Sequence, residues 1–211
     1  MTFTDMHTIL EPATAGVAKL DLIEISAMES AFSSVRGGLN YVTPGKYVRL
    51  LVNGGVMMSD TRMERLSNSH VVRHAKGDVL ISGLGLGMLL VPILAKPEVT
   101  SLTVLEKYQD VIDIVLPQLQ AKLPPEHMAK LKVVLADVLE FKVKELGGQK
   151  FDVVYHDIWP DICTDNLTEV TALKRKFAKS LKPEGWQGAW MEDTLRSRRV
   201  KEKKEERRWY R

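Results

Sequence analysis

Four short motifs place residues suited to binding a nucleoside and an acceptor after successive apolar runs. The first is Gly83-Leu84-Gly85-Leu86-Gly87, which follows the predicted strand 78–82. Glycines allow a tight turn and a close approach of backbone N–H groups to a ligand, and a helix that follows adds its positive end. The spacing is not the dinucleotide pattern G-x-G-x-x-G, and no Lys-Ser or Lys-Thr pair follows, so a nucleoside without phosphates fits better. The alternative is a glycine turn needed only for packing.

Carboxylates end the next two predicted strands. Glu106 closes strand 102–106 and can accept hydrogen bonds from ribose hydroxyls, and Asp137 follows strand 132–136, where it can accept one from an exocyclic adenine amine. Lys107 and Val138, which follow them directly, are assigned to the same site. Each carboxylate also has an ordinary structural explanation, because Glu106 can cap the next helix and Asp137 can be the N-cap of a helix over 138–145. Three motifs at one edge of a parallel sheet nevertheless predict a nucleoside site.

The fourth predicted strand, 151–156, leads into the expected acceptor site. Asp157 is the predicted catalytic carboxylate, because it can pair with a cationic substrate or take a proton when partly desolvated. Trp159 and Asp161 are the predicted substrate-binding residues, although Trp159 can also be a surface-loop aromatic that caps the sheet. His156 is expected on the opposite face, as a satisfied buried histidine. No metal-binding motif and no nucleophile elbow is found, so no metal and no covalent mechanism is predicted.

The elements that must position these residues alternate from residue 76 onward between short apolar runs and helical stretches. This pattern predicts an α/β fold with a doubly wound, mainly parallel sheet of the Rossmann-like type. Five strands are expected, at 78–82, 102–106, 132–136, 151–156 and 187–191. Helices are expected at 88–94, 108–119, 138–145 and 167–181, and Pro117 can end the second early.

The first 75 residues predict an antiparallel β-hairpin. Runs 47–51 and 56–60 are joined through Asn53-Gly54, a strong hairpin signal. Residues 17–25 alternate well enough for a further strand, with a helix as the alternative, and 63–75 predicts a helix that leads into the core. The predicted organisation is therefore an N-terminal β-hairpin segment with a lead-in helix over 1–75, an α/β ligand-binding core over 76–195 and a basic tail over 196–211.

Composition limits the class of protein. The 211 residues are 45% hydrophobic and 27% charged, a globular composition, and the single cysteine, Cys163, cannot form an intramolecular disulfide. The N-terminus does not resemble a signal peptide, and the longest apolar run, 88–95, is too short to span a bilayer, so the expected location is cytoplasmic with no membrane partner.

The charge is unevenly distributed along the chain. The net charge is +3, but residues 196–211 hold nine Lys/Arg against three Glu, or +6, which leaves 21 against 24, or −3, for residues 1–195. A charge-paired terminal helix in solvent is the favoured interpretation of this tail. A polyanion-binding arm, with nucleic acid as its partner, stays open as the less favoured alternative.

The motifs together resemble class I S-adenosylmethionine-dependent transferases and, within that superfamily, spermidine synthases. The resemblance rests on Gly83 to Gly87, Glu106, Asp137 and Asp157 in order, on Ile81-Ser82 before the glycines, and on the hairpin sequence 50–58 that continues to Arg62 and Glu64. It covers roughly residues 47–193. It implies that Gly83, Gly85 and Gly87 line the cofactor, that Glu106 holds the ribose, that Asp137 meets the adenine and that Asp157 faces the acceptor.

Three departures from the spermidine synthase pattern concern the same region. Met58 stands where those enzymes have a cofactor-contacting Gln, Ser67-Asn68 stands for Tyr-Gln, and 157–160 stands for Asp-Ser-Ser-Asp. The resemblance therefore predicts an S-adenosylmethionine-dependent methyltransferase-like enzyme with a spermidine synthase-like fold and an unidentified small-molecule acceptor. The alternatives are an aminopropyltransferase that uses decarboxylated S-adenosylmethionine, or a cofactor-binding protein without turnover. The fifth strand is expected as an edge unless a partner or the N-terminal segment covers it, and a homodimer is expected.

Overall fold

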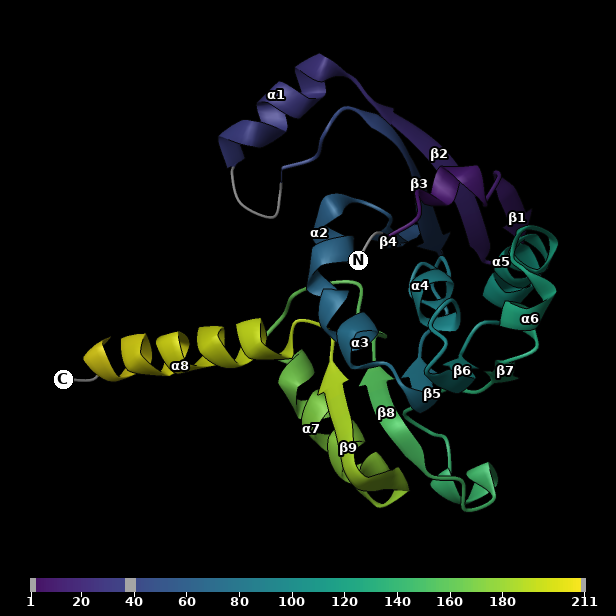
Figure 1. Cartoon of the computed structure of the whole chain (residues 1–211). Coiled ribbons are helices and arrows are strands. Elements are labelled where there is room, and N and C mark those ends of the chain that lie inside the picture. The colour runs from purple at the N-terminus through teal and green to yellow at the C-terminus, as the bar shows by residue number, and fades with distance from the viewer. Residues whose placement is uncertain (1–2, 37–40, 210–211) are drawn as a thin grey trace.

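Apolar runs in the second half of the chain form a parallel sheet in the order β7-β6-β5-β8-β9 (Figure 1). The computed structural model describes residues 3–36 and 41–209. Its parallel strands are β5 (Gly77–Ser82), β6 (Val99–Glu106), β7 (Leu131–Leu135), β8 (Phe151–His156) and β9 (Leu181–Ala189). The central strands β5 and β8 are continuous apolar runs because both of their faces are buried. The predicted α/β fold class is confirmed.

Helices connect these strands and pack on the sheet. In chain order they are α2 (Arg62–Ser67), α3 (Ser69–His74), α4 (Leu90–Leu94), α5 (Gln109–Lys122), α6 (Pro125–Met128) and α7 (Asn166–Phe177), with short 3₁₀ turns η3 (Val143–Leu146) and η4 (Ala178–Ser180). α4 and α5 contact β6, α3 contacts β8, and α7 contacts β8 and β9. The crossovers therefore leave the carboxyl ends of all the parallel strands at one edge of the sheet, where the predicted site residues lie.

The N-terminal segment is larger than the predicted hairpin. It forms an antiparallel sheet of β1 (Ala13–Ala15), β2 (Ala18–Ile25), β3 (Gly45–Val52) and β4 (Gly55–Ser59), preceded by the 3₁₀ turn η1 (Met6–Thr8). Residues 17–25 are thus mainly strand, and Asn53-Gly54 makes the hairpin turn with both φ angles positive, at 51° and 78°. Between β2 and β3 the chain forms α1 (Ala27–Arg36), which lies at the end of the sheet far from β1 (Figure 1).

The antiparallel sheet is fastened to α5 of the parallel sheet by hydrogen bonds between distant parts of the sequence. The Val17 N–H donates to Asp110 Oδ2 at 2.8 Å, and the Glu11 N–H donates to Gln118 Oε1 at 2.7 Å. Gly16 has a positive φ of 46°, and a side chain there would overlap the Asp110 carboxylate. The two sheets share one hydrophobic core, so the N-terminal segment is a fixed part of the fold.

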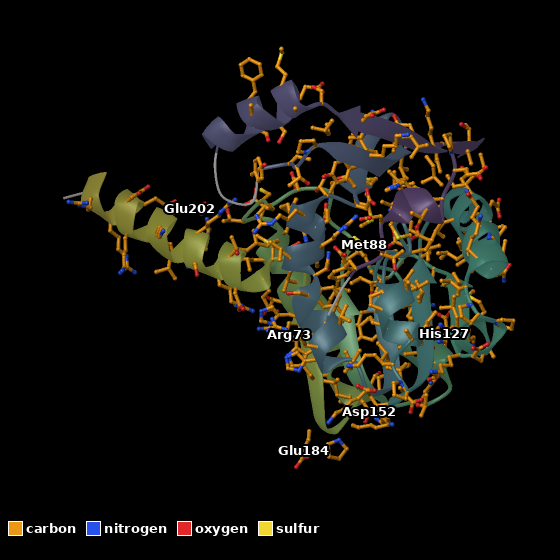
Figure 2. All side chains as sticks on the ribbon, turned by 45° about the horizontal axis from the view of Figure 1, so that its top comes forward. Arg73, Met88, His127, Asp152, Glu184 and Glu202 are labelled. Carbon is orange, nitrogen blue, oxygen red and sulfur yellow. The ribbon has the colours of Figure 1, made fainter. Side chains whose placement is uncertain are left out.

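The C-terminal segment is the helix α8 (Glu192–Trp209), which begins on the body and projects from it (Figure 1). Glu192 pairs with Lys174 of α7, and Leu195 is buried. From Arg196 onward most side chains are exposed, and Figure 2 places Glu202 on the projecting part. Residues 210 and 211 of the predicted tail lie outside the described residues. Within the described part of the chain, no helix has the length and apolar character needed to cross a membrane.

Several predicted boundaries were wrong for identifiable reasons. The helix predicted over 138–145 is instead a turn followed by η3, because Asp137 accepts the Leu139 N–H and Gly147 adopts a left-handed conformation soon after. The helix predicted over 63–75 is divided into α2 and α3 at Asn68, whose side chain accepts a hydrogen bond from Tyr155. The fifth strand begins six residues earlier than predicted and ends at Ala189. In contrast, α5 runs through Pro117 to Lys122.

Candidate active site

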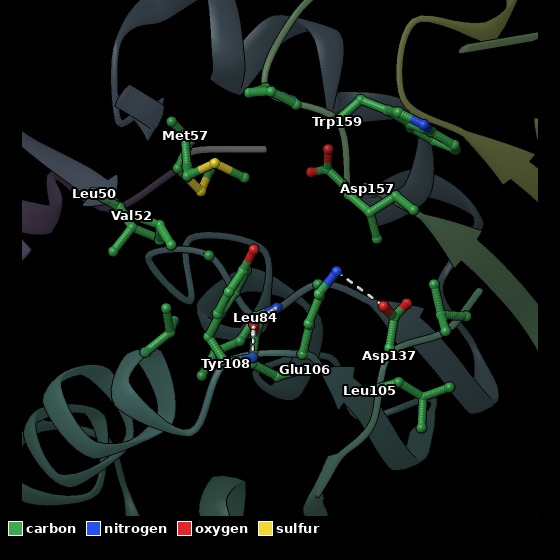
Figure 3. A pocket seen from close by; sticks show the side chains of 18 of the residues that line it. Leu50, Val52, Met57, Leu84, Leu105, Glu106, Tyr108, Asp137, Asp157 and Trp159 are labelled. Carbon is green, nitrogen blue, oxygen red and sulfur yellow. Dashed lines mark hydrogen bonds and ion pairs between the residues drawn. The ribbon is translucent and has the colours of Figure 1, made fainter. Parts of the chain in front are cut away.

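A pocket of about 370 Å³ lies where the two sheets meet, at the carboxyl ends of β5, β6, β7 and β8 (Figure 3). One wall is the glycine loop, and Leu50, Val52 and Met57 of the antiparallel sheet form the opposite wall. Most of the lining is apolar. The volume lies within the range of about 300–1,000 Å³ that is common for small-molecule sites.

The three glycines of the loop have different structural roles. Gly83, Gly85 and Gly87 all have positive φ angles, of 98°, 52° and 70°. Gly83 and Gly85 line the pocket, and a side chain on them would overlap the Asp157 carbonyl oxygen and the Met58 sulfur, respectively. Gly87 is not among the residues that line the pocket, and a side chain there would overlap Leu119 of α5. All three glycines thus allow close packing, and Gly83 and Gly85 do so at the wall of the pocket.

The backbone N–H groups of the loop are largely used within the protein. The Leu84 N–H donates to Glu106, the Leu86 N–H donates to Met58 Sδ at 3.2 Å, and the Gly87 N–H donates to the Leu84 carbonyl. The Gly83 N–H donates to the carbonyl of Leu105. A phosphate-binding loop needs such N–H groups free to face the anion. The arrangement therefore supports the prediction that the loop suits a nucleoside without phosphates.

Glu106 connects the end of β6 to the glycine loop. Its Oε2 accepts the Leu84 N–H at 2.7 Å, and its Oε1 accepts the Tyr108 N–H at 2.9 Å. Burial raises the pKa of Glu106, although backbone N–H groups, first that of Leu84, act in the opposite direction. The carboxylate lines the pocket, and the backbone N–H groups of Lys107 and Gly85 also face it. Glu106 thus joins the glycine loop to the residue that precedes α5, at the wall of the pocket.

Asp137 forms an ion pair with Lys107 on the pocket wall. Their charged atoms lie 2.9 Å apart, and Asp137 Oδ1 also accepts the Leu139 N–H at 2.9 Å (Figure 3). Burial acts to raise the pKa of Asp137, but Lys107 and Leu139 outweigh it and lower the pKa. Val138 and Leu139 provide apolar wall beside the pair. The structure thus brings Lys107, Asp137 and Val138 together with Glu106, as predicted.

Two carboxyl groups, those of Asp157 and Glu64, occupy the other end of the pocket. Burial raises the pKa of Asp157 to about 7, with the Asn68 amide acting in the opposite direction. Burial, followed by the negative charge of Asp157, raises the pKa of Glu64 to about 8. Among the described residues, neither carboxylate has an ion-pair partner, and Glu64 is only 7% exposed. This end of the pocket is therefore suited to a ligand that brings positive charge or hydrogen-bond donors.

Asn68 adds an unsatisfied donor beside these carboxyl groups. Its Oδ1 accepts the Tyr155 hydroxyl at 2.8 Å, while its buried Nδ2 makes no hydrogen bond of good geometry to any described group. The preceding Ser67 accepts the Trp190 Nε1–H. The Ser67-Asn68 pair is therefore mainly a connection to β8 and to the end of β9, with one amide donor left beside Asp157.

The residues after β8 are only partly brought together. Trp159 is buried, lines the pocket, and donates from Nε1 to Glu169 at 2.7 Å. Asp161 is exposed and does not line the pocket. Its carbonyl oxygen and its carboxylate accept hydrogen bonds from the side-chain amide of Asn166 instead. His156 is fully buried against Ser82 and Gln187 on the other side of the strand, and burial lowers its pKa to about 3. His156 is thus a buried structural histidine, as expected.

The sequence-based assignment of site residues missed Glu64 and Met57. Met57 lies in a predicted hairpin strand and Glu64 in a predicted helix, and the spacing of apolar and polar residues in these elements does not indicate a pocket. Glu64 was noticed within the hairpin resemblance, but its burial depends on how α2 sits over the pocket. The described residues include no group of three or more His, Cys, Asp or Glu side chains placed to hold a metal ion.

Comparisons with known proteins identify the fold. No protein-family model matches the sequence, and no curated protein sequence matches it. Spermidine synthase from Thermotoga maritima matches in structure with a TM-score of 0.52 and 17% identity, over 85% of this chain and 55% of that one. The chain has a spermidine synthase-like fold.

A second spermidine synthase, solved in complex with the transition-state analogue AdoDATO, matches with a TM-score of 0.53 and 16% identity, again over 85% and 55% of the two chains. The N-methyltransferase NodS from Bradyrhizobium japonicum matches less well, with a TM-score of 0.43 and 16% identity over 60% of this chain and 66% of that one. The spermidine synthase-like chain thus spans about half the length of the spermidine synthases that it matches.

Proposed function

We propose that this chain is an S-adenosylmethionine-dependent transferase that acts on an amine. The observation that carries the proposal is a single pocket with a nucleoside-type end, formed by the glycine loop, Glu106 and Asp137, and an acidic end, formed by Asp157 and Glu64. The spermidine synthase-like fold supports the same assignment, since transferases that bind S-adenosylmethionine or its decarboxylated form share it.

The residues of the pocket fit the nucleoside part of the cofactor. Glu106 would accept hydrogen bonds from ribose hydroxyls beside the backbone N–H groups that it already accepts, and Asp137 would accept one from an adenine amine. Gly83 and Gly85 keep the wall free of side chains, and Val138 offers apolar contact to a planar base. When bound, the cofactor would supply an electrophilic carbon attached to a sulfonium.

The acidic end would hold and deprotonate the acceptor. A protonated amine would pair with Asp157 and Glu64, and its positive charge would lower the pKa of both groups. Asp157, whose pKa is about 7 before the amine binds, would take the proton of the attacking nitrogen as a general base. Trp159 and Met57 would exclude water from this space. Most of the rate enhancement would come from alignment.

Aminopropyl transfer is the second candidate because acidic residues outnumber basic ones in the pocket lining, which favours a more positively charged cofactor. The lining contains five acidic residues, Glu64, Glu106, Asp137, Asp157 and Glu169, against one Lys, Lys107. Decarboxylated S-adenosylmethionine carries one more net positive charge than S-adenosylmethionine, so this balance favours it. Methyl transfer stays the first candidate because Met58 and Ser67-Asn68 replace residues typical of the spermidine synthase pattern. Binding without turnover is the third outcome that the experiments must distinguish.

Calorimetric titration tests the proposal. The intact protein is titrated with S-adenosylmethionine, its decarboxylated form, S-adenosylhomocysteine and methylthioadenosine. We expect binding of at least one pair, tighter for the carboxylated pair, and a loss of about tenfold or more in Glu106→Gln. Glu126→Gln, an exposed glutamate on α6, is the matched control and should bind like the wild type. Absence of binding to all four ligands would contradict the proposal.

Turnover is then measured with a panel of acceptors. Incubation with primary and secondary amines, alcohols and carboxylic acids should release nucleoside product only with amines. S-adenosylhomocysteine as product would establish methyl transfer, whereas methylthioadenosine would establish aminopropyl transfer. Binding with no product from any acceptor would leave a cofactor-binding protein without turnover.

A further inference from the structure

A buried side-chain amide lies behind the acidic end of the pocket. Asn68 stands at the junction of α2 and α3 and is fully buried. Its backbone N–H donates to the Glu64 carbonyl at 3.1 Å. The residue before it, Ser67, accepts the Trp190 Nε1–H at 2.9 Å. The junction is therefore held in place from both sides, and the Asn68 side chain has little freedom to move.

The Tyr155 hydroxyl determines how this amide is turned. It donates to Asn68 Oδ1 at 2.8 Å, and both groups are buried. Burial, followed by the negative charges of Asp157 and Glu64, raises the pKa of Tyr155 well above its usual value, so the hydroxyl keeps its proton and remains a donor. Because this donor takes the oxygen of the amide, the Nδ2 group is left for another acceptor.

The Asn68 Nδ2 group makes no hydrogen bond of good geometry within the part of the chain that the structure describes. A buried donor without a partner is unfavourable and needs an explanation. The neighbouring acceptor is Asp157, since the Asn68 amide lies close enough to lower the pKa of that carboxyl against the effect of burial. With the amide turned the other way, Oδ1 would face the carboxylate, and two acceptors would oppose each other.

The alternation of side chains along β8 brings Tyr155 and Asp157 to the same amide. Successive side chains of a strand point to opposite faces, and His156, between these two residues, makes its hydrogen bonds on the other face. Asp157 lines the pocket, and Figure 3 shows its carboxylate there, whereas Asn68 is not among the lining residues. Asn68 can therefore influence a ligand in the pocket only through Asp157.

We propose that Asn68 is a positioning residue for Asp157. Its amide, turned by the Tyr155 hydroxyl, donates from Nδ2 to one oxygen of the ionised Asp157 carboxylate and leaves the other oxygen for the acceptor nitrogen. A hydrogen bond to a charged acceptor is stronger than one between neutral groups, so the bond favours the ionised state that pairs with an amine or takes its proton. The role in transfer rests on the proposed function, but the hydrogen bond itself does not.

The surroundings of Asp157 explain why a neutral donor is useful there. The titratable groups that interact with Asp157 are Glu64 on α2, whose pKa is raised by burial and then by the charge of Asp157, and Tyr155 on β8. An ionised Glu64 opposes a negative charge on Asp157, whereas the Asn68 amide favours it. The amide therefore keeps Asp157 available as a carboxylate without adding a cation that would repel an amine.

NMR of the full chain without ligand tests the hydrogen bond. The side-chain amide of Asn68, assigned by its loss in Asn68→Ala, is followed from about pH 5 to about pH 9. We expect its resonances to shift with a midpoint near pH 7, because burial raises the pKa of Asp157 to about 7. The transition should persist in Glu64→Gln and disappear in Asp157→Asn. Resonances that do not respond to pH, or that respond equally in Asp157→Asn, would overturn the inference.

The pH profile of turnover tests the positioning role. In Asn68→Ala the acidic limb of the single-turnover rate with an amine acceptor should move to higher pH, with a loss of about tenfold near pH 6 and less than about threefold near pH 9. Affinity for the nucleoside product should change by less than about threefold. Because Asn68→Ala leaves a buried hydroxyl without its acceptor, Tyr155→Phe is the second variant. It should move the limb in the same direction by a smaller amount, since the amide is still present but no longer held.

Ser67→Ala is the matched control at the same junction. It removes the acceptor of the Trp190 Nε1–H, so it should lower the melting temperature and keep the pH profile of the wild type. A loss of rate in Asn68→Ala that is equal at every pH would reduce Asn68 to a packing role. Product formation without the NMR transition would overturn this inference alone. Absence of product with every amine would contradict the proposed function and the role in transfer, and the NMR titration would then still decide whether the hydrogen bond exists.

Discussion

The Leu84 N–H donates to Glu106 Oε2 at 2.7 Å, although the two residues are 22 positions apart. The carboxylate that is assigned to the ribose therefore also holds the glycine loop in place. Loss of the Glu106 side chain should loosen the loop even in the absence of a ligand. An experiment without ligand therefore tests the loop-holding role separately from ribose binding.

Substitution of Glu106 should release two backbone amides. In Glu106→Ala, the N–H groups of Leu84 and Tyr108 lose their acceptor, so their amide hydrogen exchange should accelerate in the protein without ligand. Glu106→Gln keeps one carbonyl oxygen and should show a smaller effect. Exchange rates measured by NMR check this, with the Leu119 amide of α5 as internal reference. If the Leu84 and Tyr108 amides in both variants exchange as slowly as in the wild type, Glu106 does not hold the loop.

Gly85 and Gly87 should respond differently to substitution. Gly85→Asp places bulk and charge against the flexible end of Met58 and should abolish nucleoside binding, with a loss of stability like that of Gly87→Ala because φ is positive at both positions. Gly87→Ala collides with Leu119 in a left-handed backbone conformation, so it should lower the free energy of unfolding by about 1–3 kcal/mol. Calorimetric affinity and chemical denaturation distinguish the two outcomes. A Gly85→Asp protein with wild-type affinity would place the nucleoside elsewhere.

Stability should fall as the pH rises because Glu64 has a raised pKa. The folded protein retains a proton on Glu64 up to about pH 8, whereas the unfolded chain releases it near the ordinary value of 4.5. Between these values the folded state binds more protons, so the free energy of unfolding decreases with increasing pH. Glu64→Gln should remove much of this slope and stabilise the protein at pH 9 by on the order of 2–4 kcal/mol. Urea unfolding at pH 5, 7 and 9 measures the effect.

Glu145→Gln, an exposed glutamate of η3, is the control for the pH experiment and should keep the slope of the wild type. If Glu64→Gln is as sensitive to pH as the wild type, the carboxyl group is not buried in the way described. Asp157, whose pKa is raised to about 7, contributes in the same direction over a lower pH range.

Asp157 should matter for turnover more than for nucleoside binding. Asp157→Asn retains the size of the side chain but cannot take a proton, so turnover with an amine acceptor should fall by a factor of about 10²–10⁴. Affinity for the nucleoside product should change by less than about threefold, because Glu106 and Asp137 are untouched. Single-turnover rates and calorimetry give the two numbers. A large loss of product affinity with little loss of rate would reverse the assignment.

The projecting part of α8 should be dispensable for the pocket. Truncation after Ser197 removes an exposed contact of Arg198 with the Ile162 carbonyl and a partly buried contact of Glu202 with Thr164. We expect nucleoside affinity unchanged and the melting temperature lowered by no more than a few degrees. The same variant, compared with the full chain in a gel-shift assay with DNA and RNA at increasing salt, checks the polyanion-binding alternative for the tail.

The sequence predicted the parallel sheet well because its central strands are buried on both faces and read as continuous apolar runs. The sequence also predicted that Glu106, Asp137 and Asp157 lie close together, because each stands at the carboxyl end of a predicted parallel strand. Glu64 could not be found in this way, because its burial depends on packing between α2 and the pocket rather than on local spacing. Asp161 was misplaced for a related reason: the loop after Trp159 turns away from the pocket, and Asp161 accepts the side-chain amide of Asn166 at the start of α7.

The attachment of the antiparallel sheet to α5 has a consequence for the order in which the protein forms during synthesis. The residues that start this sheet leave the ribosome well before their anchors, because Asp110 and Gln118 follow 93 and 107 residues later. Contacts of such large sequence separation form late and slow folding. We therefore expect the antiparallel sheet to dock late, with its apolar face exposed until α5 has been synthesised.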